Sequence, residues 1–335
     1  MLKNLVLAGL ALTLLSLGGA KAAPAAAGAA PAPLEIPYNA IAYDVWPLWQ
    51  AIDQGLFRKY GDDVRPGGAM QSPAIVASIL SGETKFAIVG EDAVISADLN
   101  GGDIVILTSD TEKLLLAMFA SPAVHNVAGL KGKKIAISQF GTTTDFLARY
   151  VLQHAGLEAV KDVALIPVGS LANRVAALQS GATDAAIIGP PITFKAEKLG
   201  FHAIANMYDY DLLFYTSSLV AKRSWVKTHR AETLNVIRGY IAGGASIAHD
   251  KDAALASLGK YTKISDPEIL QKTYQGYMKV LLKVPVPKTA AIETGLAQSK
   301  LPAAKKADPA QFIDPSFVEE LNKDGFMASL YRHGK

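Results

Sequence analysis

Cysteine is absent from the sequence of 335 residues. Its absence excludes disulfide bonds, which need paired thiols. It also excludes a lipid-modified N-terminal cysteine. We therefore expect a mature protein that is free in its compartment and is not lipid-anchored.

A large excess of charge of one sign is also lacking. The chain has 33 Lys and Arg residues against 30 Asp and Glu residues. Two of the lysines, Lys3 and Lys21, lie in a segment that we expect to be removed, which leaves 31 basic against 30 acidic residues. A nearly neutral chain lacks the basic surface typical of nucleic-acid binding, so no nucleic-acid partner is expected. The length and the 50% hydrophobic content suffice for two domains.

No apolar run is long enough to span a membrane. The run from Leu5 to Leu17 covers about 13 residues, whereas a spanning helix needs roughly 20. Lys3 precedes this run and Ala20-Lys21-Ala22 follows it, which is the layout of a cleavable secretory signal. Residues 1–22 are therefore predicted to be a signal peptide that directs the chain to a bacterial periplasm. Residues 23–33 are Ala- and Pro-rich and are expected to form a flexible lead-in.

Signatures of catalysis are missing too. There is no Ser-His-Asp order, no Gly-rich phosphate loop and no spacing typical of metal ligands. The six histidines are dispersed along the chain: His125, His154, His202, His229, His249 and His333. The sequence therefore predicts no catalytic residue, no cofactor and no metal site.

An internal repeat is the most informative feature that is present. Residues 74–90 (AIVASILSGETKFAIVG) and residues 173–189 (NRVAALQSGATDAAIIG) match without a gap at eight of seventeen positions. Each copy predicts a helix that ends at Ser-Gly, because Gly supplies a left-handed residue that stops a helix. A short apolar strand and a further Gly follow in both copies. Two such units predict an α/β protein with two similar lobes, whose strand ends face each other across a cleft.

Three loops between a predicted strand and the next helix are candidates for binding. Tyr43 and Trp46 follow the first strand, and an aromatic pair there could form a pocket wall, although a core position for Trp46 fits equally well. Ser72 is a candidate N-cap before Pro73, at a helix start that could hold an anionic or carbonyl oxygen. Residues 141–145 could form a polar cradle, or Thr142 and Asp145 could form a capping box alone.

Four segments together resemble one family. They are LKGKKIAI (130–137), GTTTDFLARYVLQHAGL (141–157), VGSLANRVAALQSGATDAAIIGPP (168–191) and LFYTSSLVAKRSWV (213–226). Their order and spacing are similar to those of the solute-binding proteins of nitrate, sulfonate and taurine type ABC importers. The resemblance implies a two-lobed periplasmic binding protein of type II. Each lobe would be a mixed, mostly parallel sheet flanked by helices, with the ligand cleft between lobes. It implies lobe I at 34–124 plus 217–335 and lobe II at 125–216.

The resemblance also implies a function and a site. The expected function is capture of a small polar or anionic organic solute by lobe closure, and delivery to a membrane permease with a separate ATPase by a monomeric protein. The implied ligand-binding residues, with Trp46 added from its position after the first strand, are Tyr43, Trp46, Met70, Gln71, Ser72, Gly90, Glu91, Thr108, Gly141, Thr142, Thr143, Gly189, Pro190 and Tyr215.

Three acidic residues depart from what an anion-binding member would need. Asp44, Glu91 and Asp110 follow predicted strands at loops that could face the cleft. An unpaired carboxylate beside a bound anion is unfavourable, so either these side chains point away or the ligand is not a simple anion.

Three other functions remain to be compared. One is binding of a pyrimidine thiamine precursor or an aromatic solute. Another is synthesis of that precursor on the same scaffold, which the lack of cysteine disfavours. The third, a ligand-sensing domain of a transcription factor, would need a DNA-binding helix-turn-helix and no export signal, and neither condition is met.

Overall fold

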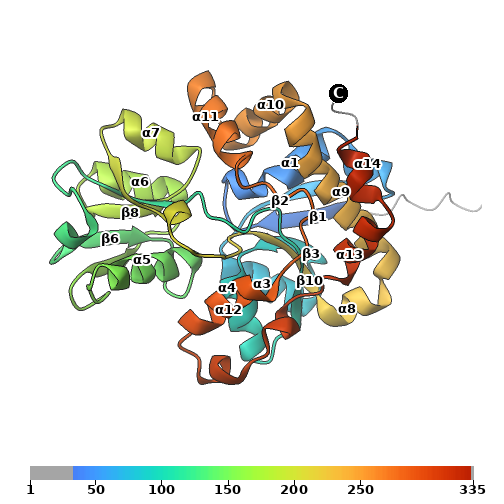
Figure 1. The fold of residues 1–335 in the computed structure, drawn as a ribbon, viewed down its shortest axis with the longest axis horizontal. Coiled ribbons are helices and arrows are strands. Elements are labelled where there is room, and N and C mark those ends of the chain that lie inside the picture. Colours follow the sequence, from blue (N-terminus) through green and yellow to red (C-terminus); the bar gives the residue numbers. More distant parts are fainter. Residues whose placement is uncertain (1–32, 333–335) are drawn as a thin grey trace, which may run out of the picture. The chain divides into compact units, whose positions relative to one another are not determined.

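The computed structural model describes residues 33–332, in which two five-stranded sheets form the centre of the fold (Figure 1). The signal peptide and nearly all of the lead-in predicted above lie outside these residues. The first sheet has the order β2-β1-β3-β10-β4 and consists of β1 (Leu34–Tyr38), β2 (Val64–Ala69), β3 (Phe86–Val89), β4 (Ile104–Thr108) and β10 (Ser218–Lys222). The second has the order β7-β6-β8-β5-β9 and consists of β5 (Ala117–Ala120), β6 (Lys134–Ile137), β7 (Ala164–Pro167), β8 (Ala185–Ile188) and β9 (His202–Asn206).

The two sheets have the same topology. In each, the first three strands of the order are parallel, and the fourth is antiparallel to both of its neighbours. The predicted fold class, a mixed and mostly parallel sheet in each of two lobes, is therefore confirmed. Strand β2 was not predicted, because Pro66, Gly67 and Gly68 interrupt its apolar pattern.

Helices cover both faces of each sheet. The helices that pack with the first sheet or its neighbours are α1 (Trp46–Asp53), α2 (Leu56–Lys59), α3 (Ser72–Ser81), α4 (Glu91–Leu99), α8 (Arg223–Thr228), α9 (Arg230–His249), α10 (Lys251–Thr262), α11 (Pro267–Tyr277), α12 (Thr289–Gln298), α13 (Ser316–Lys323) and α14 (Phe326–Leu330). Those of the second are α5 (Thr143–His154), α6 (Leu171–Gln179) and α7 (Ile192–Lys198). Short 3₁₀ segments are η1 (Tyr43–Val45), η2 (Val127–Leu130), η3 (Met207–Asp209), η4 (Pro302–Lys306) and η5 (Pro309–Phe312).

The alternation of side chains along each strand explains the two-faced packing. In the second sheet, Ile135 and Ile187 pack with α5 on one face, while Ala136 and Ile188 pack with α6 and α7 on the other (Figure 1). Successive residues of a strand point to opposite faces, so a strand buried on both sides is apolar throughout. The first sheet follows the same rule: one face packs with α1 and α9, and the other with α3, α4 and α12.

The internal repeat is confirmed as a structural repeat. Helix α3 leads into β3, and helix α6 leads into β8, each at the third place of its sheet. Gly82 and Gly181 adopt φ values of +84° and +70° just after these helices. A residue without a Cβ takes this left-handed conformation without steric cost, which explains why both copies have Gly there.

One strand lies in a different lobe from the one predicted. The boundary predicted at residue 124 assigned residues 117–120 to lobe I, whereas β5 pairs with β8 and β9 in the second sheet. An apolar strand carries no local signal of which sheet it joins. We therefore propose that the chain first crosses between lobes before Ala117, and that it crosses back near residue 217, before β10.

Helix α9 packs closely on α1, which begins three residues after Tyr43. A Cβ added to Gly243 would lie 2.1 Å from the carbonyl oxygen of Pro47 and 2.9 Å from the Cβ of Ala51. The neighbouring Gly244 has only Leu281 Cδ1, at 3.5 Å, as a contact. The absence of a side chain at Gly243 is therefore what permits this helix crossing.

Candidate functional site

A cavity of about 400 Å³ lies at the carboxyl ends of strands from both sheets. Loops after β1, β2, β6, β7 and β8 form most of its wall. Its lining residues are Asn39, Ala40, Ile41, Ala42, Asp44, Ala69, Met70, Gln71, Ser72, Leu116, Ser138, Thr142, Thr143, Thr144, Gly169, Ser170, Leu171, Ala172, Arg174, Gly189, Pro191, Ile192, Thr216 and Thr262. Its size suits a small solute, and its position is where open α/β sheets bind ligands.

Three helices of eight or more residues begin at this cavity. They are α3, α5 and α6, and the residues at their first turns are part of its wall. The first N–H groups of a helix have no partner within the helix, and they carry a partial positive charge. The cavity is therefore surrounded by backbone donors that favour an anionic or carbonyl group.

Capping at these helix starts differs from the sequence prediction in two places. The N-cap of α3 is Gln71 and not Ser72, which is the first helical residue. Thr142 is the N-cap of α5, but its hydroxyl donates to Gln139 O at 2.7 Å and makes no capping bond. Asp145 Oδ2 accepts from Gly141 N at 2.9 Å, so the capping box, which was the alternative to a polar cradle, does not form.

The hydroxyls of the α5 loop form a cluster instead. Ser138 Oγ lies 2.7 Å from Thr142 Oγ1 and 2.9 Å from Thr144 Oγ1. All three residues line the cavity. A hydroxyl can act as donor or acceptor, so each O–H bond of the cluster can turn to suit a polar ligand. Ser170, by contrast, caps α6 with its side chain, which accepts from Asn173 N.

Arg174 is the cation at this site. It lies in the first turns of α6 and is only 7% exposed. Its Nε donates to Ile187 O and one terminal nitrogen donates to Gly169 O, both at 2.8 Å. Burial lowers the pKa of Arg174 to about 10, so it remains charged at neutral pH. No carboxylate lies within 4.0 Å of it among residues 33–332.

Asp44 is the carboxylate at this site. It lies in η1 of the first lobe and is 6% exposed. Its Oδ1 has no hydrogen-bond partner in the described part of the chain. Thr216 also lines the cavity. Burial raises the pKa of Asp44, although the hydroxyls of Thr216 and Ser217 lower it.

The other two acidic residues lie outside the lining of this cavity. Glu91 is fully buried, and its Oε2 accepts from Tyr215 N at 2.9 Å. Asp110 accepts from Tyr240 at 2.8 Å and from Tyr277 at 2.5 Å. Burial raises the pKa of both carboxyls, that of Asp110 to about 7. Of the three acids noted in the sequence, only Asp44 therefore bears on the ligand's charge.

The structure brings six of the fourteen predicted site residues to the cavity wall. These are Met70, Gln71, Ser72, Thr142, Thr143 and Gly189. Four others point into the core with their own partners: Trp46 donates to Ser257, Thr108 donates to Pro285 O, and Tyr43 and Tyr215 accept from backbone N–H groups of Leu115 and Lys288. Glu91 is the buried acid described above.

The remaining three lie close to the cavity without lining it. Gly141 lines a second cavity, of about 460 Å³, with Phe140 and Arg149. Pro190 O accepts from Tyr43 N at 3.4 Å. A Cβ at Gly90 would lie 2.4 Å from Asp92 Oδ1 and 3.0 Å from Thr143 Oγ1. Thr143 Oγ1 donates to Asp92 Oδ1 at 2.7 Å, which joins α5 of the second lobe to α4 of the first.

Sequence reasoning missed several residues of the wall, of which Arg174 is the most important. Its signal was available: the aligned position in the other copy of the repeat is Ile75, which is buried in the core. A charged residue that replaces a core residue in one copy needs a local reason. Asn39, Leu116, Gly169 and Thr262 had no such signal.

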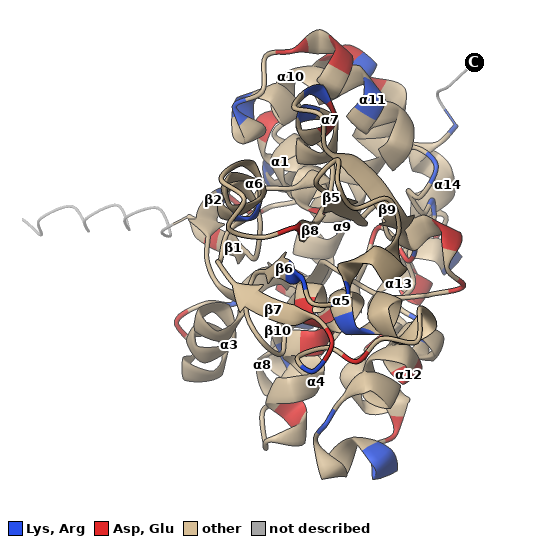
Figure 2. Ribbon diagram, turned by 90° about the vertical axis from the view of Figure 1, so that its left-hand side faces the viewer, with Lys and Arg blue, Asp and Glu red and all other residues tan. Residues whose placement is uncertain are grey.

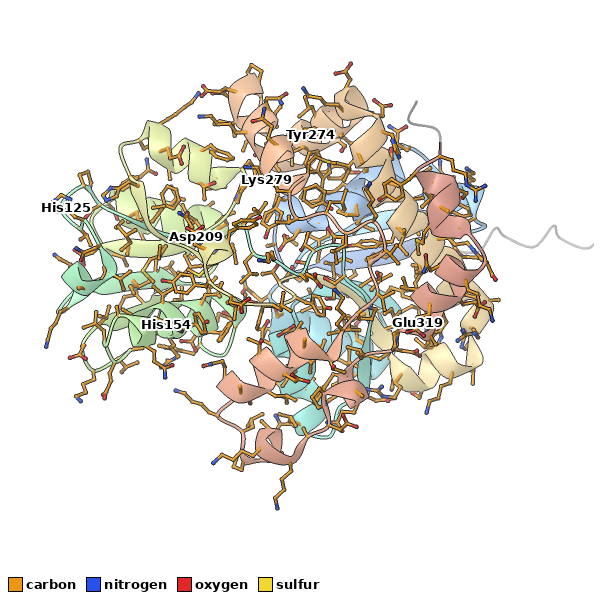
Figure 3. The ribbon with its side chains drawn as sticks, viewed as in Figure 1. His125, His154, Asp209, Tyr274, Lys279 and Glu319 are labelled. Atoms are coloured by element: carbon orange, nitrogen blue, oxygen red, sulfur yellow. The ribbon has the colours of Figure 1, made fainter. Side chains whose placement is uncertain are left out.

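The charged residues and the histidines are spread over both lobes. Figure 2 shows Lys and Arg positions interspersed with Asp and Glu positions along the ribbon. His125 lies in the loop before η2 and His154 lies at the end of α5, both in the second lobe (Figure 3). The rings of His125 and His202 lie 6.5 Å apart, so these two are less dispersed than the sequence suggested. No group of three His, Asp or Glu side chains that could hold a metal ion occurs within residues 33–332.

None of the helices in the described ranges combines the length and hydropathy that a membrane-spanning helix needs. Two lobes of equal topology, with a cavity at the strand ends of both, define the fold of two-lobed periplasmic binding proteins. The chain belongs to the NMT1-like family, whose model matches residues 27–258.

Solved structures share this fold, and one curated relative is similar in sequence. The periplasmic aliphatic sulphonate binding protein SsuA from Escherichia coli has a TM-score of 0.68 at 20% identity, over 86% of this chain and 94% of that one. The periplasmic nitrate-binding protein NrtA from Synechocystis PCC 6803 has a TM-score of 0.74 at 14% identity, over 90% and 91%. The "Putative binding protein YtlA" of Bacillus subtilis (strain 168) is 22% identical over 240 residues, which are 70% of this chain and 72% of that protein.

Proposed function

We propose that this chain is the solute-binding component of an ABC importer and that its ligand is a small organic anion. The observation that carries the proposal is Arg174, a buried cation at the wall of the cavity for which residues 33–332 offer no carboxylate partner. A buried charge is costly unless it is paired, so the side chain is suited to an anionic group of a ligand. The starts of α3, α5 and α6 support the same sign of ligand charge.

Binding would proceed by lobe closure. The first lobe contributes residues 39–42, Asp44 and residues 69–72 to the wall, and the second contributes Ser138, residues 142–144, residues 169–172 and Arg174. A ligand that contacts both sets favours the closed state by the difference in its contacts with the two states. The closed protein would then dock on a permease. In line with this role, we propose that residues 1–22 export the chain to the periplasm and are removed, and that the chain acts as a monomer and has no catalytic activity.

An aromatic ligand, such as a pyrimidine precursor, has less support. The described residues that line the cavity include no Phe, Tyr or Trp. Stacking on aromatic side chains, which usually holds flat rings, is therefore not offered by this wall.

Ligand-induced stabilisation tests the proposal. The mature chain is screened by thermal unfolding with sulfonates, carboxylates, phosphonates, inorganic anions and pyrimidines. A ligand at a hundredfold excess over its dissociation constant stabilises the folded protein by about 2.7 kcal/mol. We expect at least one small organic anion to do so. If no anion in the panel raises the unfolding temperature, the proposal fails.

A variant pair ties that stabilisation to the cavity. Arg174→Gln is expected to weaken the hit at least about 30-fold, because removing one partner of a buried charge pair costs roughly 2–5 kcal/mol. Arg58→Gln is the control, since Arg58 pairs with Asp63 at an exposed place, where its side chain is 72% exposed. Equal losses in the two variants would contradict the assigned role of Arg174.

A further inference from the structure

The second cavity, of about 460 Å³, has no part in the function proposed above. Helix α4, the end of α12 and the residues just after α12 form its wall on the side of the first lobe. The loop before α5 and the first two turns of α5 form its wall on the side of the second lobe. Thr143, which lines the first cavity, donates to Asp92, which lines the second, so this contact lies between the two cavities.

The wall of the second cavity is aromatic, whereas that of the first is not. Phe140, Phe146 and Phe214 all line it. Phe140 is 54% exposed, and the rings of Phe146 and Phe214 stack with their centroids 4.8 Å apart. Small-molecule sites are typically 300–1,000 Å³ in volume, are lined mostly by apolar and aromatic side chains, and often lie between domains. The second cavity therefore suits a flat apolar group, for which the first offers no aromatic partner.

Two cations with donors to spare line the same wall. Nε of Arg149 donates to Asp145 Oδ1 at 2.7 Å, which is the one side-chain hydrogen bond that Arg149 forms with residues 33–332. Its two terminal nitrogens remain available, and a guanidinium can donate in parallel to both oxygens of a carboxylate. Lys300 forms no ion pair within the described part of the chain.

The two carboxylates of this wall, by contrast, already accept hydrogen bonds from the protein. Asp145 Oδ1 accepts from Arg149, and Asp145 Oδ2 accepts from Gly141 N at 2.9 Å. Asp92 Oδ1 accepts from Thr143 Oγ1 at 2.7 Å. Burial raises the pKa of Asp92 to about 6, although hydrogen bonds from Thr143 and from backbone N–H groups lower it. The wall thus has hydrogen-bond donors left for a ligand, and its acceptors are engaged.

We propose that the second cavity binds a small aromatic carboxylate, whose ring lies against the three Phe side chains and whose carboxylate pairs with Arg149 and Lys300. The site is separate from the first cavity and does not depend on which solute the first cavity takes. Because both lobes contribute to its wall, an occupant contacts both lobes and favours the arrangement of the lobes that holds it.

Calorimetry with the mature chain tests the site. The probes are benzoate, phenylacetate and indole-3-acetate. Each is compared with its amide, which keeps the ring and lacks the charge, and with acetate, which keeps the charge and lacks the ring. We expect at least one aromatic acid to bind about tenfold tighter or more than both its amide and acetate, since a close charge pair supplies at least that factor.

Two variants locate the bound acid, and each has a matched control. Arg149→Gln should weaken its binding about tenfold or more, and Phe140→Ala should weaken it about threefold or more. Phe140 is exposed, so this second variant is expected to fold even if Arg149→Gln does not. The controls are Arg223→Gln, an arginine of similar exposure that pairs with a carboxylate, and Tyr208→Ala, an aromatic residue that is 43% exposed, and neither residue lines a cavity described here.

Each outcome decides for or against the second site. Binding that falls in Phe140→Ala and Arg149→Gln, and not in the controls or in Arg174→Gln, supports it. Binding that falls in Arg174→Gln alone places the aromatic acid in the first cavity, so the second site is overturned while the proposed function stands. If none of the aromatic acids binds, or if the amides bind as tightly as the acids, the second site is overturned, and anion capture by the first cavity is still decided by its own screen.

Discussion

The crossing of α9 over α1 allows a prediction with a control one residue away. In Gly243→Ala the new Cβ would lie 2.1 Å from Pro47 O, a backbone atom that no rotamer change can move. The helices must separate, and overpacking of this kind typically costs 1–3 kcal/mol. Since the contact is with backbone, we expect the upper end, a free energy of unfolding lower by about 3 kcal/mol.

Gly244→Ala has the opposite expectation. Its Cβ would meet Leu281 Cδ1 at 3.5 Å, which is ordinary van der Waals contact. Ala is better than Gly inside a helix by roughly 0.5–1 kcal/mol, so the variant should be slightly more stable than the wild type. The free energies of unfolding of the two variants should thus differ by about 3–4 kcal/mol, with Gly243→Ala below the wild type and Gly244→Ala above it.

Urea denaturation followed by far-UV circular dichroism measures both free energies. Helix α1 directly follows η1, which carries Asp44, so Gly243→Ala should also weaken ligand binding. If the two variants have the same free energy of unfolding within about 0.5 kcal/mol, the close crossing is not as described and the reasoning from steric contact is refuted.

Two further predictions concern the buried carboxyls. The pKa of Asp110 is raised to about 7 from the usual 3.8, so its contribution to stability is complete below pH 3.8 and is lost as the pH rises through 7. In Asp110→Asn the free energy of unfolding, measured by urea denaturation, should therefore fall less between pH 4 and pH 8 than in the wild type, and parallel profiles would contradict this. Thr143→Val removes the donor to Asp92 that joins the lobes and should weaken ligand binding about tenfold or more at pH 8, since hydrogen bonds to charged groups contribute roughly 1.5–3 kcal/mol. The pKa of Asp92 is raised to about 6 by burial, so the loss, measured by calorimetry, should be smaller at pH 5, and an unchanged affinity at pH 8 would argue against the contact.

The repeat made the two-lobed fold predictable from the sequence. Residues 86–89 and 185–188 are apolar throughout, as strands buried on both faces must be, and each follows a helix that ends at Gly. Local patterns did not predict β2, whose Pro and Gly residues resemble a loop, or the lobe to which β5 belongs. Pairing between strands depends on contacts between residues that are far apart in the sequence, and a short stretch of sequence does not contain them.

The site was predictable as a set of loops but not residue by residue. Loops after parallel strands meet at one edge of a sheet, so Gln71, Thr142 and Gly189 could be expected in the loops that line the cavity. Whether a side chain of a loop points into the cavity or into the core depends on the local backbone conformation, which the sequence does not show. Trp46 turns to Ser257 in the core, whereas Arg174 is carried on a helix and not on a loop.

The position of the fourth strand in each sheet has a consequence for the order in which the two sheets can form. All five strands of the second sheet lie within residues 117–206, so this sheet can be completed from one continuous piece. The first sheet cannot, because β4 is joined to it only through β10, at residues 218–222. In a chain that becomes available from its N-terminus, the second sheet can thus be complete before the first. Strands β1 to β4 are made earlier, but their sheet is complete only when β10 has been added.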